Sequence, residues 1–124
     1  ALVGKENITE SVDRFKLVSL KSTSESGKAP CSDIVMTVDE IKHSSKAEGG
    51  GPVDATFKAI EMVVKSSAEL LLFSVNNITS GTDSQGVVIV RLESGGRIVN
   101  GQGSDTDIVF ASAKAYMNAL NKLF

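Results

Sequence analysis

Residues 49–60 read GGGPVDATFKAI, and this stretch marks the point where the first half of the chain changes from strands to a helix. Pro52 is well placed at the first helical position, because its missing N–H would have no partner there. From Val53 onward, apolar side chains recur at helical spacing, which predicts a helix over about residues 52–65. The bare glycines before it fit two interpretations: a tight turn, or a site where a ligand approaches the backbone.

The residues before this stretch alternate in the manner of β-strands. Three strands are predicted, over about residues 15–23, 32–38 and 40–47. The Ser, Gly and Pro content of residues 24–30 predicts a loop between the first two strands. Residues 1–14 show no clear periodicity, and we interpret them as an N-terminal arm or the remnant of a linker. The first unit therefore spans about residues 15–65.

The same order of elements recurs downstream. Strands are predicted over about residues 70–79, 87–93 and 97–101. Residues 80–86 read as a loop, and a helix is expected over about residues 106–123. A shift of 52 residues places Gly49 on Gly101 and Gly51 on Gly103, so the glycine pattern repeats as well. The second unit spans about residues 69–124, and the predicted fold is α+β with two βββα units in one domain.

Both predicted helices are apolar over most of their circumference, so each must be covered on more than one side. A three-stranded sheet with one helix would also leave one of its faces bare. We therefore expect the two units to pack together and the domain to form an intimate homodimer in which helices and sheets are sandwiched.

Composition restricts the possible functions. A chain of 124 residues with a net charge of −2 and 5% aromatic residues has neither the basic surface nor the stacking residues typical of nucleic-acid binding. No apolar run reaches the roughly 18 residues that cross a bilayer, and no signal peptide is visible, so we expect no membrane partner and a cytoplasmic location. Single residues Cys31 and His43 form no disulfide or metal-ligand pattern, so no catalytic residue and no cofactor is predicted in this chain.

The Gly-x-Gly pairs suggest a binding function. A helix N-terminus offers unpaired N–H groups and a partial positive charge, so anions bind there. Neither glycine cluster matches a nucleotide P-loop or a dinucleotide motif. Apolar residues near both clusters favour the carboxylate of a branched aliphatic amino acid, in a pocket where two helix starts converge. Simple strand-to-helix turns, with Asp105 and Asp107 as caps of the second helix, are the alternative.

Three segments together resemble one known family: GGGPVDATFKAI (49–60), GTDSQGVVIVRLESGGRIVNGQG (81–103) and SDTDIVFASAKAYMNALNKL (104–123). They are similar to the C-terminal regulatory domain of 2-isopropylmalate synthases, and citramalate synthases carry a related domain. Two positions depart from the family pattern: Gly50 stands where Asn or Asp is usual, and Phe110 where Glu is usual.

The resemblance implies two βββα units and feedback inhibition by leucine at a dimer interface. It also implies an N-terminal catalytic barrel, absent from this chain, that uses acetyl-CoA, a 2-oxo acid and a divalent metal. Transferred by motif, the effector pocket comprises Gly49, Gly51, Val53 and Asp54 at the first turn, Leu70, Phe73 and Asn77 on the next strand, and Ser104, Asp105 and Thr106 at the second turn.

Other functions remain open at this stage. Isoleucine is the expected effector if the chain belongs to a citramalate synthase. The chain is a dimerisation domain without an effector if sensing has been lost. A free-standing small enzyme is the least favoured, because the sequence shows no acid–base or metal cluster.

Overall fold

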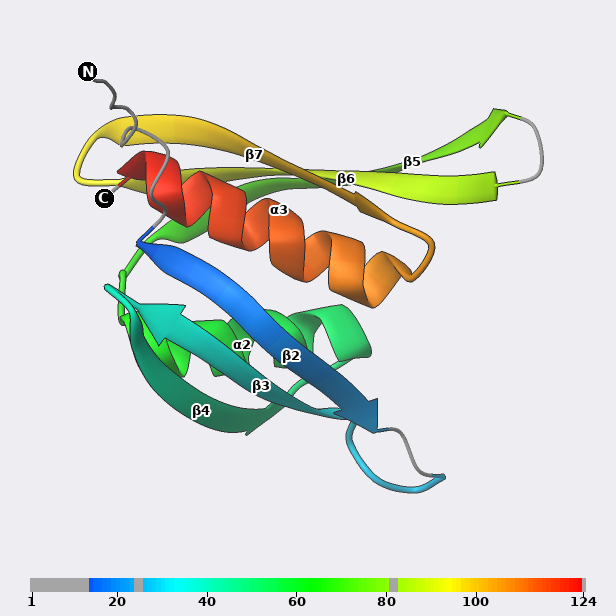
Figure 1. Cartoon of the computed structure of the whole chain (residues 1–124), viewed down its shortest axis with the longest axis horizontal. Helices are drawn as coiled ribbons and strands as arrows, with labels where there is room; N and C mark the ends of the chain where they lie inside the picture. The colour runs from blue at the N-terminus through cyan, green and yellow to red at the C-terminus, as the bar shows by residue number, and fades with distance from the viewer. Residues whose placement is uncertain (1–13, 24–25, 81–82, 124) are drawn as a thin grey trace, which may run out of the picture.

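The chain forms two consecutive βββα units, which confirms the predicted α+β fold (Figure 1). The computed structural model describes residues 14–23, 26–80 and 83–123, with the backbone alone for residues 77–80 and 83–85. Unit one contains β2 (Phe15–Thr23), β3 (Cys31–Val38), β4 (Ile41–Glu48) and α2 (Pro52–Val64). Unit two contains β5 (Glu69–Ser80), β6 (Asp83–Ser94), β7 (Arg97–Asp105) and α3 (Ile108–Leu123). The interpretation of residues 1–13 as an arm lies outside the described residues.

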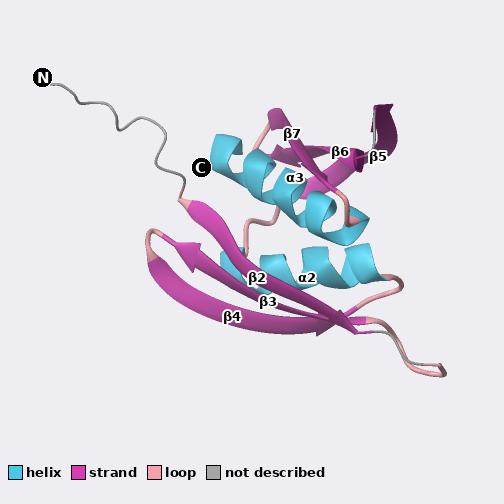
Figure 2. Ribbon diagram, turned by 45° about the vertical axis from the view of Figure 1, so that its right-hand side comes forward, coloured by secondary structure: helices cyan, strands magenta, loops and turns pink. Residues whose placement is uncertain are grey.

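The two helices lie between the two sheets. Each unit forms an antiparallel sheet, with strand order β2-β3-β4 in one and β5-β6-β7 in the other. Helices α2 and α3 run side by side in the same direction, with their N-terminal ends on the same side of the molecule (Figures 1 and 2). The hydrophobic core fills the space between the sheets and around α3, whose Ala111, Ala115 and Ala119 are fully buried.

Two predicted boundaries in unit two are wrong. The loop predicted over residues 80–86 is too long, because Ser80 belongs to β5 and residues 83–86 belong to β6, and residues 81–82 lie outside the described residues. The third strand does not end at Gly101 but continues to Asp105, and α3 begins at Ile108. Polar residues and glycine favour loops in a sequence, but backbone pairing along a hairpin does not require apolar side chains.

The structural repeat has a shift of 56 residues, not 52. This shift carries the two-residue hairpin at Asp39–Glu40 onto the hairpin at Gly95–Gly96. All four residues have positive φ, between 51° and 85°, as the tight hairpin turns with matching twist require. The 52-residue shift aligned identical glycines, whereas the structure aligns turns that have different residues.

The same shift relates the cores of the two units. The buried side chains of β3 are Ser32, Ile34 and Met36, and those of β6 at the corresponding positions are Val88, Val90 and Leu92. The pairing register changes opposite Met36 in one sheet and opposite Leu92 in the other, so both units carry a bulge at the same place. The repeat is therefore a property of shape and burial more than of residue identity.

Candidate functional site

The start of α2 is an uncapped helix N-terminus. Gly51 is the N-cap residue and gives no side-chain hydrogen bond, and Pro52 follows at the first helical position. The first intrahelical bond runs from the N–H of Ala55 to the carbonyl of Gly51, 2.9 Å away. The N–H groups of Val53 and Asp54 precede that bond, so they have no partner within the helix. A Cβ on Gly51 would meet no atom within 4 Å, so the space beside the N-cap residue is open.

A carboxylate lies beside these donors. Asp54 Oδ2 accepts a hydrogen bond from the N–H of Gly50 at 3.0 Å and pairs with Lys58 Nζ at 3.1 Å. The bond from Gly50, then the bond from Lys58, lower the pKa of the Asp54 carboxyl, which is therefore charged at neutral pH. Gly49 is required by the turn itself, because a Cβ there would lie 2.5 Å from Asp54 Oδ2. The site thus offers both N–H donors and a negative charge.

Strand β5 carries an apolar surface that the rest of the chain leaves exposed. Leu70, Phe73 and Val75, called here the β5 strip, are 42%, 39% and 40% exposed. They pair directly with Leu92, Val90 and Val88, so they lie on the face of the sheet that contains the core. Asn77 lies further along the same strand, opposite Gly86, and its side chain is outside the described part.

The strip is exposed because α3 lies close to the opposite strand of the sheet. A helix is about 10 Å wide and neighbouring strands are about 4.8 Å apart, so one helix covers two strands. A Cβ on Gly103 would lie 2.6 Å from the carbonyl oxygen of Ala111, and one on Gly101 would lie 2.5 Å from the amide nitrogen of Ala119. These glycines let α3 lie directly on β7, where it covers β7 and β6 and leaves β5 uncovered.

Unit one shows how the equivalent surface is covered. There α2 lies on β3 and β4, and α3 from the other unit covers the start of the third strand, β2, whereas Leu17 and Leu20 further along are half-buried and Ser22 is exposed. Phe15 of β2 is consequently only 4% exposed. The β5 strip is the counterpart of Leu17, Leu20 and Ser22 on this face of β2, and neither helix among the described residues covers it.

Aromatic side chains connect the β5 strip with both helices. The ring of Phe57 in α2 meets the ring of Phe73 edge-on, with 6.0 Å between centroids. The same ring lies 4.5 Å from the ring of Tyr116 in α3. Tyr116 donates a 2.7 Å hydrogen bond to Glu61 Oε2 of α2. Phe57 and Tyr116 are not among the site residues predicted from the sequence, although Phe57 lies on the same predicted apolar face of the helix as Val53.

The second predicted turn differs from the first. Ser104 and Asp105 end β7, and Thr106 lies between β7 and α3. Asp107 Oδ1 accepts the N–H of Val109 at 2.9 Å and so caps the helix start. Asp105 Oδ1 accepts the N–H of Asp107 at 3.0 Å, and that bond together with Lys114 lowers the pKa of the Asp105 carboxyl. Gly101 and Gly103 themselves lie within β7, so the expectation that the second Gly-x-Gly pair stands at a helix start is wrong.

The structure brings the predicted residues together in part. Val53 lies half-buried at the start of α2, and Phe73 contacts the same helix further along, through Phe57. Ser104, Asp105 and Thr106 lie at the start of α3, on the same side of the molecule as the start of α2 (Figures 1 and 2). The assignment of all ten residues to one pocket stays a prediction.

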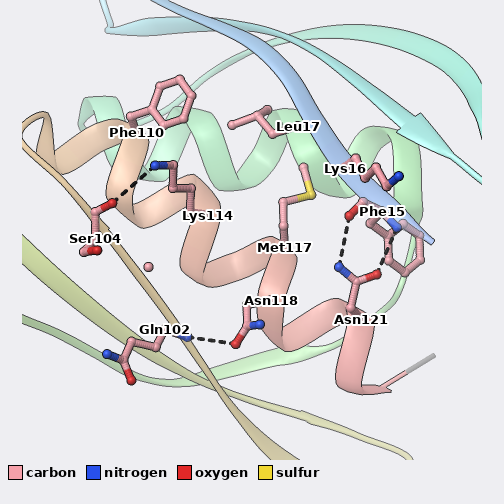
Figure 3. Close-up of a pocket in the computed structure, with 11 residues that line it drawn as sticks. Phe15, Lys16, Leu17, Gln102, Ser104, Phe110, Lys114, Met117, Asn118 and Asn121 are labelled. Atoms are coloured by element: carbon pink, nitrogen blue, oxygen red, sulfur yellow. Dashed lines mark hydrogen bonds between the residues drawn. The ribbon is translucent and has the colours of Figure 1, made fainter. Parts of the chain in front are cut away.

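A groove of about 550 Å³ was not predicted from the sequence (Figure 3). It lies between β2, β7 and α3, and its apolar lining includes Phe15, Leu17, Phe110 and Met117. Lys114 Nζ lies 5.1 Å from the centre of the Phe110 ring, so the unusual phenylalanine contacts a cation within its own chain.

The described residues give no support for a metal centre or a membrane span. No group of three or more His, Cys, Asp and Glu side chains suited to a metal ion occurs among them. Within the same residues, neither helix has the length and apolar character needed to cross a bilayer. His43 is exposed on β4.

Comparison with known proteins gives one consistent result. A family model described as the LeuA allosteric (dimerisation) domain matches residues 1–124. A protein of Thiobacillus denitrificans named 2-isopropylmalate synthase is 61% identical over 123 residues, which are 99% of this chain and 24% of that protein. Proteins of the same name from Chromobacterium violaceum and Nitrosococcus oceani are 58% and 56% identical, with the same coverage. The chain therefore spans about a quarter of the length of these relatives.

Proposed function

Since the chain belongs to the LeuA allosteric (dimerisation) domain family, we propose that it senses leucine and inhibits a 2-isopropylmalate synthase by feedback. The observation that carries this proposal is the uncapped start of α2, with a carboxylate beside it, on a helix that contacts the apolar β5 strip through Phe57. This arrangement offers a complement to each of the three chemical parts of a branched aliphatic amino acid.

Each part of leucine has a candidate partner at this site. The N–H groups of Val53 and Asp54 bind the carboxylate, with help from the helix dipole. The Asp54 side chain, already ionised, binds the ammonium group. Phe73 and its neighbours on the β5 strip contact the isobutyl group. Binding at Asn77, Ser104, Asp105 and Thr106, as implied by the family motif, is also part of this proposal.

A second copy of the chain covers the β5 strip in this proposal. Exposed apolar patches of this kind mark interfaces, and the start of the equivalent face of β2 is covered by a helix. In a two-fold dimer, α2 of the partner subunit packs on the strip, and the partner's strip packs on α2 here. Met62 on α2 is 56% exposed and gains a partner in this way. The effector then lies between the two subunits, close to Phe73.

The remaining part of the full-length protein supplies catalysis in this proposal. An N-terminal barrel condenses acetyl-CoA with 2-oxoisovalerate with the aid of a divalent metal, and this chain contributes no group to that reaction. Leucine inhibits because it binds the inhibited state more tightly than the active state. A coupling free energy of about 1–3 kcal/mol is typical of such effectors.

Calorimetry of the full-length protein with leucine, isoleucine and valine tests the proposal. We expect leucine to bind most tightly and to reduce activity. A preference for isoleucine would indicate that this chain has the effector expected of citramalate synthases. An intact dimer that binds none of the three amino acids would indicate a dimerisation domain that has no effector. Leucine and isoleucine differ in the position of one methyl group, so their binding free energies are expected to differ by about 1–3 kcal/mol.

A substitution at Gly51 tests the location of the site. Gly51→Asp puts a carboxylate at the N-cap, where it caps the helix and occupies the donors that leucine needs. We expect a folded dimer that no longer binds leucine. Gly50→Ala is the matched control, because a Cβ there meets no atom within 4 Å. Normal leucine binding by Gly51→Asp would show that the site lies elsewhere.

A further inference from the structure

Helix α3 is fixed to β7 by a row of polar side chains. Lys114 donates to the carbonyl of Ser104 at 3.3 Å, Asn118 accepts from the N–H of Gln102 at 3.1 Å, and Lys122 donates to the carbonyl of Asn100 at 2.7 Å. Four helical residues advance about 6.0 Å and two strand residues about 6.6 Å, so the two spacings match over three contacts. These contacts hold α3 on its own sheet.

Asn121 of α3 instead binds the first strand of unit one. Asn121 Oδ1 accepts the N–H of Phe15 at 2.9 Å, and Asn121 Nδ2 donates to the carbonyl of Phe15 at 3.0 Å (Figure 3). An amide side chain thus pairs with both backbone groups of one residue, as a neighbouring strand would. Phe15 is the first residue of β2, and its side chain belongs to the core. The Phe15–Asn121 contact therefore fixes the start of β2 relative to α3.

The residue before Phe15 is fixed on its other side. Arg14 binds Asp39 of the β3–β4 hairpin through two side-chain contacts of 3.0 and 3.1 Å. The N–H of Asp39 donates to the carbonyl of Arg14 at 2.9 Å. The direction in which the chain approaches the domain is therefore set by α3 on one side and by the hairpin on the other.

Helix α3 also contacts the proposed effector region. Tyr116 stacks on Phe57, which touches Phe73 of the β5 strip, and bonds to Glu61 of α2. Tyr116 and Asn121 are five residues apart, little more than one helical turn. Helix α3 has 16 residues, and the contacts with β7 join it to its own sheet, so it should shift as a rigid unit. A shift at Tyr116 would then reach Phe15 through Asn121.

We propose that Asn121 is the positioning residue that passes the effector signal from α3 to the segment preceding β2. This inference rests on the proposed function, because it assumes that the catalytic part precedes this domain in the polypeptide. Occupation of the surface around Phe73 shifts α3, and the Phe15–Asn121 contact carries the shift to the start of β2. Without that contact, leucine still binds but the signal is not passed on.

The test compares two asparagines of α3 in the full-length protein. Asn121→Ala removes the contact with β2, and Asn118→Ala removes a similar backbone contact with β7. We expect Asn121→Ala to remain a dimer and to bind leucine, but to keep at least fivefold more activity than the wild-type protein at saturating leucine, the lower end of typical coupling. Asn118→Ala should be inhibited like the wild-type protein. Full inhibition of Asn121→Ala, or equal loss of inhibition in both variants, would overturn the inference.

Hydrogen exchange distinguishes failure of this inference from failure of the proposed function. In Asn121→Ala the amide of Phe15 should exchange faster than in Asn118→Ala, with or without leucine. If the wild-type protein binds no leucine, the proposed function fails. If it binds leucine and the wild-type exchange at Phe15 is unaffected by leucine, the transmission role fails alone. If Asn121→Ala does not fold, Asn121→Asp replaces it in the test, because an aspartate accepts from the N–H of Phe15 but cannot donate to its carbonyl. A fully inhibited Asn121→Asp would count against the proposal.

Discussion

Replacement of Gly101 by alanine should destabilise the fold strongly. The new Cβ would lie 2.5 Å from the amide nitrogen of Ala119 and 2.7 Å from its Cβ, and would also meet the carbonyl oxygen of Ala115. Real Cβ contacts are longer than 3.0 Å, and the atoms in the way include backbone of a buried helix, so α3 must move away from β7. Overpacking of this kind costs about 3 kcal/mol, the upper part of its usual range.

Chemical and thermal unfolding at a fixed chain concentration measure this cost. A loss of about 3 kcal/mol corresponds to a decrease in Tm of roughly 12 °C for a chain of this size. Gly50→Ala is the control: its Cβ meets nothing, so stability should change by less than about 0.5 kcal/mol. If Gly101 instead exposed backbone for a ligand, Gly101→Ala would unfold like the wild-type protein and lose leucine binding. That result would refute the packing argument.

Three further predictions follow from particular contacts. Tyr116 is the single tyrosine, and its burial and its hydrogen bond to the Glu61 carboxylate raise its pKa. Its contribution to stability is therefore complete below about pH 10, the pKa of tyrosine in the unfolded chain, and declines as the pH rises further. Tyrosinate absorbance at pH 11 should appear only when the chain unfolds. Phe73→Asp should convert the proposed dimer to monomers in sedimentation, whereas Ile41→Asp, at a residue 64% exposed on β4, should not. A dimeric Phe73→Asp would show that the β5 strip is not the interface. Asp107→Ala should lower stability by about 1 kcal/mol through loss of the cap on α3, and Asp107→Asn should retain most of it; equal loss in both variants would argue against capping.

The contrast between the two helix starts has a functional consequence. The side chain of Asp107 caps the start of α3. Helix α2 begins at a glycine and a proline, so no side chain caps its first backbone N–H groups. The two units are similar in fold but differ at their helix starts. Among the described residues, the start of α2 has an N-cap residue without a side-chain cap and an ionised carboxylate beside it, so the proposed effector chemistry depends mainly on unit one and on the β5 strip.

The amino-acid sequence alone determined the order of strands and helices, because alternation and helical spacing are local properties of the chain. It also determined the start of α2, since proline at the first helical position and glycine before it act through their own backbone. The resemblance to the LeuA domain family rested on the same local motifs, and the family match confirmed it.

Only the tertiary structure decided what the second glycine pair does. In sequence, Gly101 and Gly103 look like the turn at Gly49 and Gly51, but they lie in a strand beneath a helix. The exposure of the β5 strip and the Phe15–Asn121 contact likewise depend on elements far apart in the chain. A residue's role in such places is set by the element that packs against it, and periodicity along one segment carries no information about that neighbour.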